Sequence, residues 1–341
     1  MRWNPNGDDS RPSIDDYLAE TGHEEEAESY RMSTYAWSPT LTPDKKLRIT
    51  KSSLGTFGWC RQQYYLEKFK DMRGEQQDHH IRGLNVHDMM EWFWANFTTE
   101  QEVEVLALAD DVPKARQLFY SASPTPPEPY IYGEDEQIAQ WAEWQFQRLL
   151  HTGGKQWRPV GVEANIHATR FVEVDGEGIP VHMNGFIDTL FADDDTFALM
   201  ELKSGKYSTR SKPGSMRKEM AFYKMMLEHS NHAEFLPITH WGWEFPGGGI
   251  NGGDGPAIFY EKERATSMQS VEKALQKLVK AHIDMEFPPD PWMKKKLHDE
   301  ETLEEMLERN ALKCSWCDFK EHCSFWSLTD EFLDEIMEEK Q

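Results

Sequence analysis

The chain has 341 residues, of which 60 are acidic and 37 basic, so its formal net charge is −23. A hydrophobic fraction of 38% leaves no apolar run near the roughly 20 residues that a membrane-spanning helix needs. The opening residues MRWNPNGDDS lack the basic start and apolar stretch of a secretory signal. We therefore expect a soluble cytoplasmic protein with no membrane partner, in the host cytoplasm if the source is viral. So acidic a total ordinarily disfavours nucleic acid as a partner, because Lys and Arg carry phosphate binding.

The first half of the chain divides into an acidic tail and a helical region. Residues 1–44 hold 10 acidic and 3 basic residues without apolar periodicity, which predicts a mostly disordered tail. Over residues 49–70, spaced apolar side chains behind Ser52 or Ser53 as N-cap predict one helix that contains Cys60. A helical region is therefore expected over residues 45–158, with further helices after Gly83, over 101–121 and over 135–151.

After Pro159 the pattern changes to alternating β-branched and aromatic residues. It predicts three strands over 160–174, 181–192 and 196–204, then a helix over 214–229. Two more strands, over 238–245 and 257–261, and a helix over 266–285 follow. The order indicates an α/β (α+β) core over residues 159–286, with a mixed sheet flanked by helices. Residues 287–341 form a separate, charged C-terminal segment.

Two carboxylates flank a predicted hairpin turn at Asp193–Asp195. If the turn is centred between Asp194 and Asp195, paired residues have numbers that sum to 389, which places Asp188 opposite Glu201. Alternation along the strand then puts Lys203 on the same face as Glu201 and turns Leu202 toward the core. Two close carboxylates and a lysine suit a divalent metal that hydrolyses phosphodiesters. The alternative is that both are ordinary surface acids, and a shift of one residue in register would separate them.

The same residues carry a family resemblance. Gly185-Phe-Ile-Asp188 followed by Glu201-Leu-Lys203-Ser-Gly resembles the G-x-x-D and E-x-K-x-G motifs of RecB-like PD-(D/E)XK nucleases. Gly83-Leu-Asn-Val-His87 is similar to the G-x-x-x-H helix of that branch, and Glu163 to the acid of its first motif. Glu219-Met-Ala-Phe-Tyr223 resembles the Q-x-x-x-Y helix, with Glu in place of Gln.

The resemblance implies a restriction-endonuclease-like core and assigns roles to its residues. Asp188, Glu201, His87 and the Leu202 carbonyl would bind Mg²⁺ or Mn²⁺, and Lys203 would be the catalytic amine beside Asp188 and Glu201. The implied activity is a DNA exonuclease that prefers single-stranded ends. Candidate substrate or secondary residues are Glu163, Tyr223, Lys206 and Arg217.

The four cysteines form a second candidate metal site. Cys314, Cys317 and Cys323 have the tight spacing of metal ligands, and Cys60 is the only other cysteine. Four thiolates suit zinc or an iron-sulfur cluster, and the spacing alone leaves both open. One distant cysteine with a C-terminal trio resembles the structural 4Fe-4S cluster of AddB-type and CRISPR-associated RecB-like exonucleases, which implies such a cluster in the C-terminal segment.

The local distribution of charge changes the conclusion that the net charge disfavours nucleic acid as a partner. Residues 45–85 hold 9 basic and 4 acidic residues, and residues 200–224 hold 7 and 2, so both segments that flank the predicted metal site are basic. This favours DNA as the partner. Two alternatives stay open, a non-catalytic nucleic-acid-binding adaptor subunit on a nuclease scaffold and a zinc-stabilised interaction protein. CRISPR adaptation, recombination or repair, with protein partners, and viral DNA processing are all compatible with these motifs.

Overall fold

The structure is a computed structural model. It describes residues 46–74, 78–123, 133–192, 195–205, 212–230, 237–248, 257–288, 314 and 317–323. The predicted tail over 1–44, Lys206 and most of the segment over 287–341 lie outside these residues, so those predictions stay predictions. Within the described part of the chain, no helix combines the length and the apolar character needed to cross a membrane.

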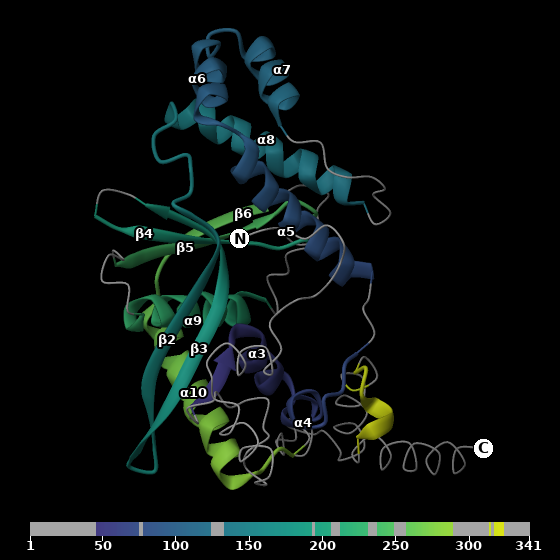
Figure 1. Ribbon diagram of the computed structural model, residues 1–341, viewed down its shortest axis with the longest axis vertical. Coiled ribbons are helices and arrows are strands. Elements are labelled where there is room, and N and C mark those ends of the chain that lie inside the picture. The colour runs from purple at the N-terminus through teal and green to yellow at the C-terminus, as the bar shows by residue number, and fades with distance from the viewer. Residues whose placement is uncertain are drawn as a thin grey trace, which may run out of the picture.

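A six-stranded mixed sheet forms the centre of the molecule (Figure 1). Five strands follow one another in the order β1-β3-β4-β5-β6. The sixth strand, β2, pairs with β3 and is not part of this order. The β1–β3 and β4–β5 pairs are parallel, and the other pairs are antiparallel. This confirms the predicted α/β core with a mixed sheet. The strands are β1 (Leu47–Thr50), β2 (Gly161–Val174), β3 (Glu177–Ala192), β4 (Phe197–Leu202), β5 (Ile238–Phe245) and β6 (Ala257–Lys262).

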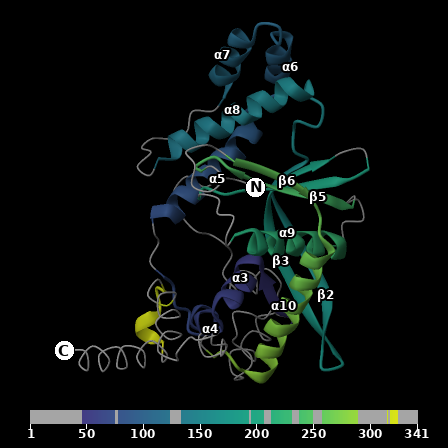
Figure 2. The same cartoon turned by 180° about the vertical axis from the view of Figure 1, so that it is seen from behind.

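Helices cover both faces of this sheet (Figures 1 and 2). The N-terminal helices α5 (Asp78–Asn96), α6 (Thr99–Ala107), α7 (Val112–Ala122) and α8 (Glu134–Thr152) lie on one side. On the other side lie α9 (Lys212–His229) and α10 (Ala265–Asp284). The helical stretch expected over 101–121 consists of α6 and α7, because the Asp111 side chain caps a new helix by accepting the Lys114 N–H.

The prediction of one helix over 49–70 is wrong in its start, its continuity and its N-cap. The chain first forms β1 and then two helices, α3 (Lys51–Trp59) and α4 (Arg61–Phe69), separated by an extended Cys60. The N-cap is Thr50 rather than a serine, since its hydroxyl accepts the Ser53 N–H while the Ser53 hydroxyl accepts the Thr50 N–H. Parallel pairing with β3 therefore fixes the start of α3 against the sheet.

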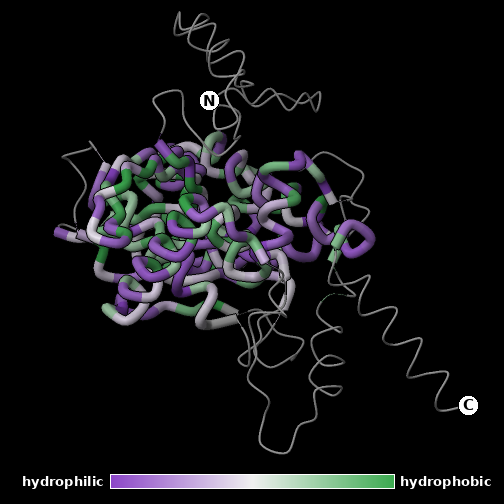
Figure 3. The backbone as a smooth tube through the Cα atoms, turned by 90° about the horizontal axis from the view of Figure 1, so that it is seen from below, coloured by the Kyte–Doolittle hydropathy of each residue, from purple (hydrophilic) through white to green (hydrophobic). Residues whose placement is uncertain are grey.

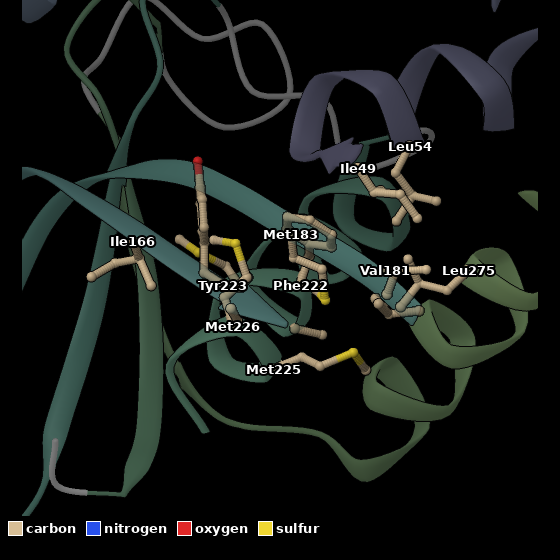
Figure 4. Close-up of a cluster of buried hydrophobic side chains, with 14 of the residues drawn as sticks. Ile49, Leu54, Ile166, Val181, Met183, Phe222, Tyr223, Met225, Met226 and Leu275 are labelled. Atoms are coloured by element: carbon tan, nitrogen blue, oxygen red, sulfur yellow. The ribbon is translucent and has the colours of Figure 1, made fainter. Parts of the chain in front are cut away.

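Two hydrophobic cores hold these layers together. Figure 3 shows that hydrophobic segments gather toward the inside of the chain trace and hydrophilic ones toward its outside. The larger core lies between the sheet, α3, α9 and α10, and Figure 4 shows part of it around Met183, Phe222 and Met226. The smaller is rich in aromatic side chains from α5, α7 and α8. At Gly185 a Cβ would lie 3.3 Å from Tyr223 Cε1, so the missing side chain lets α9 approach β3 closely.

Candidate active site

The β3–β4 hairpin has the register that the sequence predicts. Thr189 pairs with Met200 and Leu190 with Leu199, each pair summing to 389. Asp188 and Glu201 occupy the next position in this register, and their residues are only 4% and 2% exposed. Leu202 is buried in the smaller core, as expected from alternation. Burial of two neighbouring carboxylates is costly unless cations or hydrogen bonds compensate for it.

Three potential metal ligands converge at one end of this hairpin. His87 Nδ1 lies 3.1 Å from Glu163 Oε1 and 3.7 Å from Asp188 Oδ2. One ligand atom of each of these three residues lies within 4.8 Å of the others. Asp188 Oδ2 also accepts the Leu202 N–H at 2.7 Å, which orients the carboxylate from its own sheet.

His87 reaches the sheet because of how α5 packs. Its neighbour Val86 is buried in the aromatic core, and the Asn85 side chain donates to Glu134 Oε1 of α8 at 2.6 Å. Both contacts fix the rotation of α5, so that His87 Nε2 lies 3.2 Å from the Leu202 carbonyl oxygen. Glu163 arrives with a backbone φ of +44°, a left-handed conformation that is strained for Glu within a strand.

The second carboxylate, Glu201, is held by two lysines. Its Oε1 accepts Lys203 Nζ at 2.8 Å and also contacts Lys51 Nζ, from the first residue of α3. Lys203 donates in addition to Glu219 Oε2 of α9 at 2.8 Å. The other oxygen, Glu201 Oε2, is buried and has no hydrogen-bond partner among the described residues.

These contacts shift the titration of the site. Burial alone would lower the pKa of His87, but the Asp188 carboxylate, with Glu163, outweighs it and raises the pKa to about 9. Burial, reinforced by repulsion from Glu201, raises the pKa of Asp188. For Glu201 burial acts in the same direction, yet Lys51 and Lys203 lower the pKa of its carboxyl below the ordinary value. Both lysines therefore remain protonated near neutral pH.

The donor set fits a divalent metal. Carboxylate oxygens with one imidazole are ligands that Mg²⁺ or Mn²⁺ accepts. The unpaired Glu201 Oε2 adds a buried acceptor that needs a cation or donor to compensate its desolvation. His87, Glu163 and Asp188, with Glu201 beside them, are therefore the residues that would hold the ion.

The remaining predicted residues differ in their positions. Tyr223 is buried below the site, where Lys51 Nζ lies 5.1 Å from the centre of its ring. Arg217 instead pairs with Glu261 of β6, through Nε at 2.6 Å and Nη2 at 2.9 Å. The sequence interpretation missed Lys51 and the ion pair of Lys203 with Glu219. Only the basic character of residues 45–85 pointed toward Lys51.

Away from this site, a short C-terminal segment that includes Cys317 and Cys323 lies beside α4 (Figures 1 and 2), and Cys60 lies near Cys317. Asp318 contacts Gly74, which follows α4. Burial raises the pKa of the Cys317 thiol, and the nearby Cys60 and Cys323 thiols raise it further. Cys314 lies one turn before Cys317, and its carbonyl oxygen accepts the Cys317 N–H at 2.9 Å.

The fold places carboxylates of the interior strands β3 and β4, and the lysine directly after β4, beside a histidine of α5, an arrangement suited to metal-assisted phosphodiester hydrolysis. The chain belongs to the PD-(D/E)XK nuclease superfamily, whose family model matches residues 48–324. It is a nuclease of this superfamily, a class of enzyme that uses divalent metals and acts on nucleic acid. The RecB-like branch and its iron-sulfur subgroup stay predictions.

Two solved structures resemble the chain. The protein SSO0001 is 10% identical with a TM-score of 0.36, and the match covers 90% of this chain and 96% of that one. A protein from Eubacterium rectale described as a candidate exonuclease is 14% identical with a TM-score of 0.38, covering 74% and 89% of the two chains. No curated protein matches this chain at significant similarity.

Proposed function

We propose that this nuclease is a Mg²⁺- or Mn²⁺-dependent deoxyribonuclease that acts as an exonuclease on single-stranded DNA ends. The observation that carries the proposal is the convergence of His87, Glu163 and Asp188 beside the Glu201–Lys203 pair. The Glu201–Lys203 pair and His87 line a cavity of about 410 Å³ that a phosphate backbone can enter.

Each residue of the site has a definable task in this reaction. His87, Glu163, Asp188 and Glu201 would hold a divalent ion, which would supply polarisation of the scissile phosphate and a lower pKa of the attacking water. Lys203, held by Glu201 and Glu219, provides a fixed ammonium group that neutralises negative charge as it develops on the phosphate. The Leu202 N–H keeps the Asp188 carboxylate oriented, and the packing of α5 keeps His87 in place.

The preference for ends and for single strands derives from the resemblance to RecB-like nucleases, and a substrate comparison tests it. A linear single strand, its duplex and a closed circular single strand would be incubated with Mn²⁺, Mg²⁺ or EDTA. We expect short products from the linear single strand, slower cleavage of the duplex, an intact circle and no cleavage in EDTA. Equal cutting of the circle would contradict exonuclease action. Inactivity in both metals would favour a non-catalytic DNA-binding adaptor.

We further propose that Cys60, Cys314, Cys317 and Cys323 bind a structural 4Fe-4S cluster that joins the C-terminal segment to α4. The proximity of Cys60 and Cys323 to Cys317 supports this, because the two segments are far apart in the chain. Anaerobic purification should give a brown protein with about four irons and four sulfides, lost in Cys60→Ser. A colourless, zinc-containing protein would contradict the cluster and favour the zinc-stabilised alternative.

The cellular role is also a proposal, and it rests on the resemblance to RecB-like nucleases. A cytoplasmic nuclease of this kind, with protein partners, would serve recombination and repair, CRISPR adaptation or viral DNA processing.

A further inference from the structure

We propose that Lys51 is a second active-site lysine, which binds a backbone phosphate of the DNA, and that its charge is coupled to Glu219. This inference rests on the nuclease function proposed above. It adds a substrate-binding residue that is separate from the metal ligands and from Lys203.

The backbone holds Lys51 rigidly at the site. It is the first residue of α3 and directly follows β1, whose last residue Thr50 pairs with Asn184 of β3. The reciprocal bonds between Thr50 and Ser53 fix the first turn of the helix. Lys51 therefore reaches Glu201, 150 residues later in the chain, from a sheet-anchored position.

The Lys51 side chain also remains partly accessible. Its side chain is 27% exposed, equal to that of Lys203, and both line the cavity of about 410 Å³. Ser204 and Ser215 line the same cavity. A phosphate entering this space would meet the Lys51 and Lys203 side chains in its wall.

The charges of the site explain why a second lysine is useful. Four carboxylates, on Glu163, Asp188, Glu201 and Glu219, stand against the two lysines, a formal net charge of −2. One divalent ion, with a neutral His87 as ligand, brings this group to zero. Without Lys51 a negative charge would remain and would repel the phosphate that has to enter.

A purely structural role does not require this lysine. Lys203 alone already pairs with Glu201 and Glu219, at 2.8 Å each. Lys51 Nζ shares the same Glu201 oxygen and lies 4.0 Å from Glu219 Oε2. Loss of the Glu219 charge should therefore compensate for loss of the Lys51 charge.

The test measures DNA binding and metal binding separately. Binding of a labelled single-stranded oligonucleotide would be followed by anisotropy in Ca²⁺ for Lys51→Met, Lys51→Arg, Glu219→Gln and the double variant K51M/E219Q. Lys277→Met, at an exposed position of α10, is the matched control. Calorimetry would give the Mn²⁺ affinity of the same proteins, and thermal unfolding would establish that each is folded.

We expect Lys51→Met to weaken DNA binding about tenfold, the loss of one charged contact. It should also make the slope of log K against log salt shallower by about 0.7, as for one phosphate on a single strand. Lys51→Arg and K51M/E219Q should recover most of the affinity. Mn²⁺ affinity should not fall in Lys51→Met, because the variant removes a cation from beside the ligands.

The outcomes separate this inference from the function on which it rests. If wild type cleaves DNA while Lys51→Met binds it like Lys277→Met, the Lys51 inference is overturned and the nuclease stands. If Lys51→Met loses Mn²⁺ affinity, its role is structural and the inference also falls. If wild type binds without cleaving and the Lys51→Met effect persists, phosphate binding is supported while the proposed nuclease function fails.

Discussion

Asp188 combines burial, which it shares with Glu201, with a hydrogen bond from the backbone. It is almost fully buried, and it accepts the N–H of Leu202, the residue that follows Glu201. Burial raises the pKa of its carboxyl, so this group binds a proton more readily than an exposed Asp does. A divalent ion in contact with it would replace that proton and keep the carboxylate charged.

Substitution of Asp188 by Asn tests its role as a ligand. The change keeps the size and an acceptor for the Leu202 N–H but removes the charge, so folding should be retained. We expect Mn²⁺ affinity, measured by calorimetry, to fall about 100-fold. Lys277→Met is the control, and unchanged affinity in Asp188→Asn would exclude Asp188 from the metal site.

Among the residues of the site, some positions could be predicted from the sequence and others could not. The Asp188–Glu201 register followed from a single local turn, so its arithmetic needed no long-range information. Lys51 approaches the site from 150 residues before Glu201, through parallel pairing of a four-residue strand, and no spacing in the sequence encodes that contact. The Lys203–Glu219 ion pair likewise depends on how α9 packs against β2 and β3.

At the scale of elements, an aromatic cluster joins α4 to α10. His282 packs against Tyr64, Phe69 and Phe287, and its Nε2 lies 2.9 Å from the Tyr64 hydroxyl. Burial lowers the pKa of His282 to about 4. Folding therefore requires a neutral ring at this position.

This cluster predicts a pH-dependent stability. Unfolded His282 has an ordinary pKa near 6.5, above its folded value, so the unfolded state gains protons first as pH falls. The stability contribution is complete above about pH 6.5 and is lost on acidification toward pH 4. Between pH 7 and pH 5 wild type should lose about 2 kcal/mol more free energy of unfolding than His282→Phe, measured by urea denaturation. Parallel losses in both proteins would show that His282 does not titrate as described.

Most elements could be predicted because their periodicity is local. The three strands over 160–204 and the helix over 214–229 match β2, β3, β4 and α9 closely. The break between α3 and α4 could not be predicted, because Cys60 itself adopts the extended conformation, whereas Gly58, two residues before it, lies within α3. Tertiary packing of α4 against α10 accounts for the change in direction.

For the whole molecule, the net charge of −23 restricts where a nucleic acid can bind. Acidic residues outnumber basic ones over the chain as a whole, whereas residues 45–85 and 200–224, which flank the site, are basic. The affinity for nucleic acid should therefore depend on contacts with few phosphates and on the bound metal ion.

Salt titration in Ca²⁺ and in EDTA tests this restriction. For a single-stranded oligonucleotide we expect a slope of log K against log salt no steeper than about −3, equivalent to about four phosphates. Affinity should be higher in Ca²⁺, because the ion removes the net negative charge of the site. A steep slope that is independent of metal would indicate a binding surface outside the cleft.

The central claim is that this site hydrolyses DNA with the help of Lys203. Single-turnover cleavage of an end-labelled single strand in Mn²⁺ tests it most directly, with wild type, Lys203→Ala and the control Lys277→Met compared at equal concentration. We predict a rate at least about 100-fold lower in Lys203→Ala and an unchanged rate in the control. Equal rates in wild type and Lys203→Ala would contradict the account.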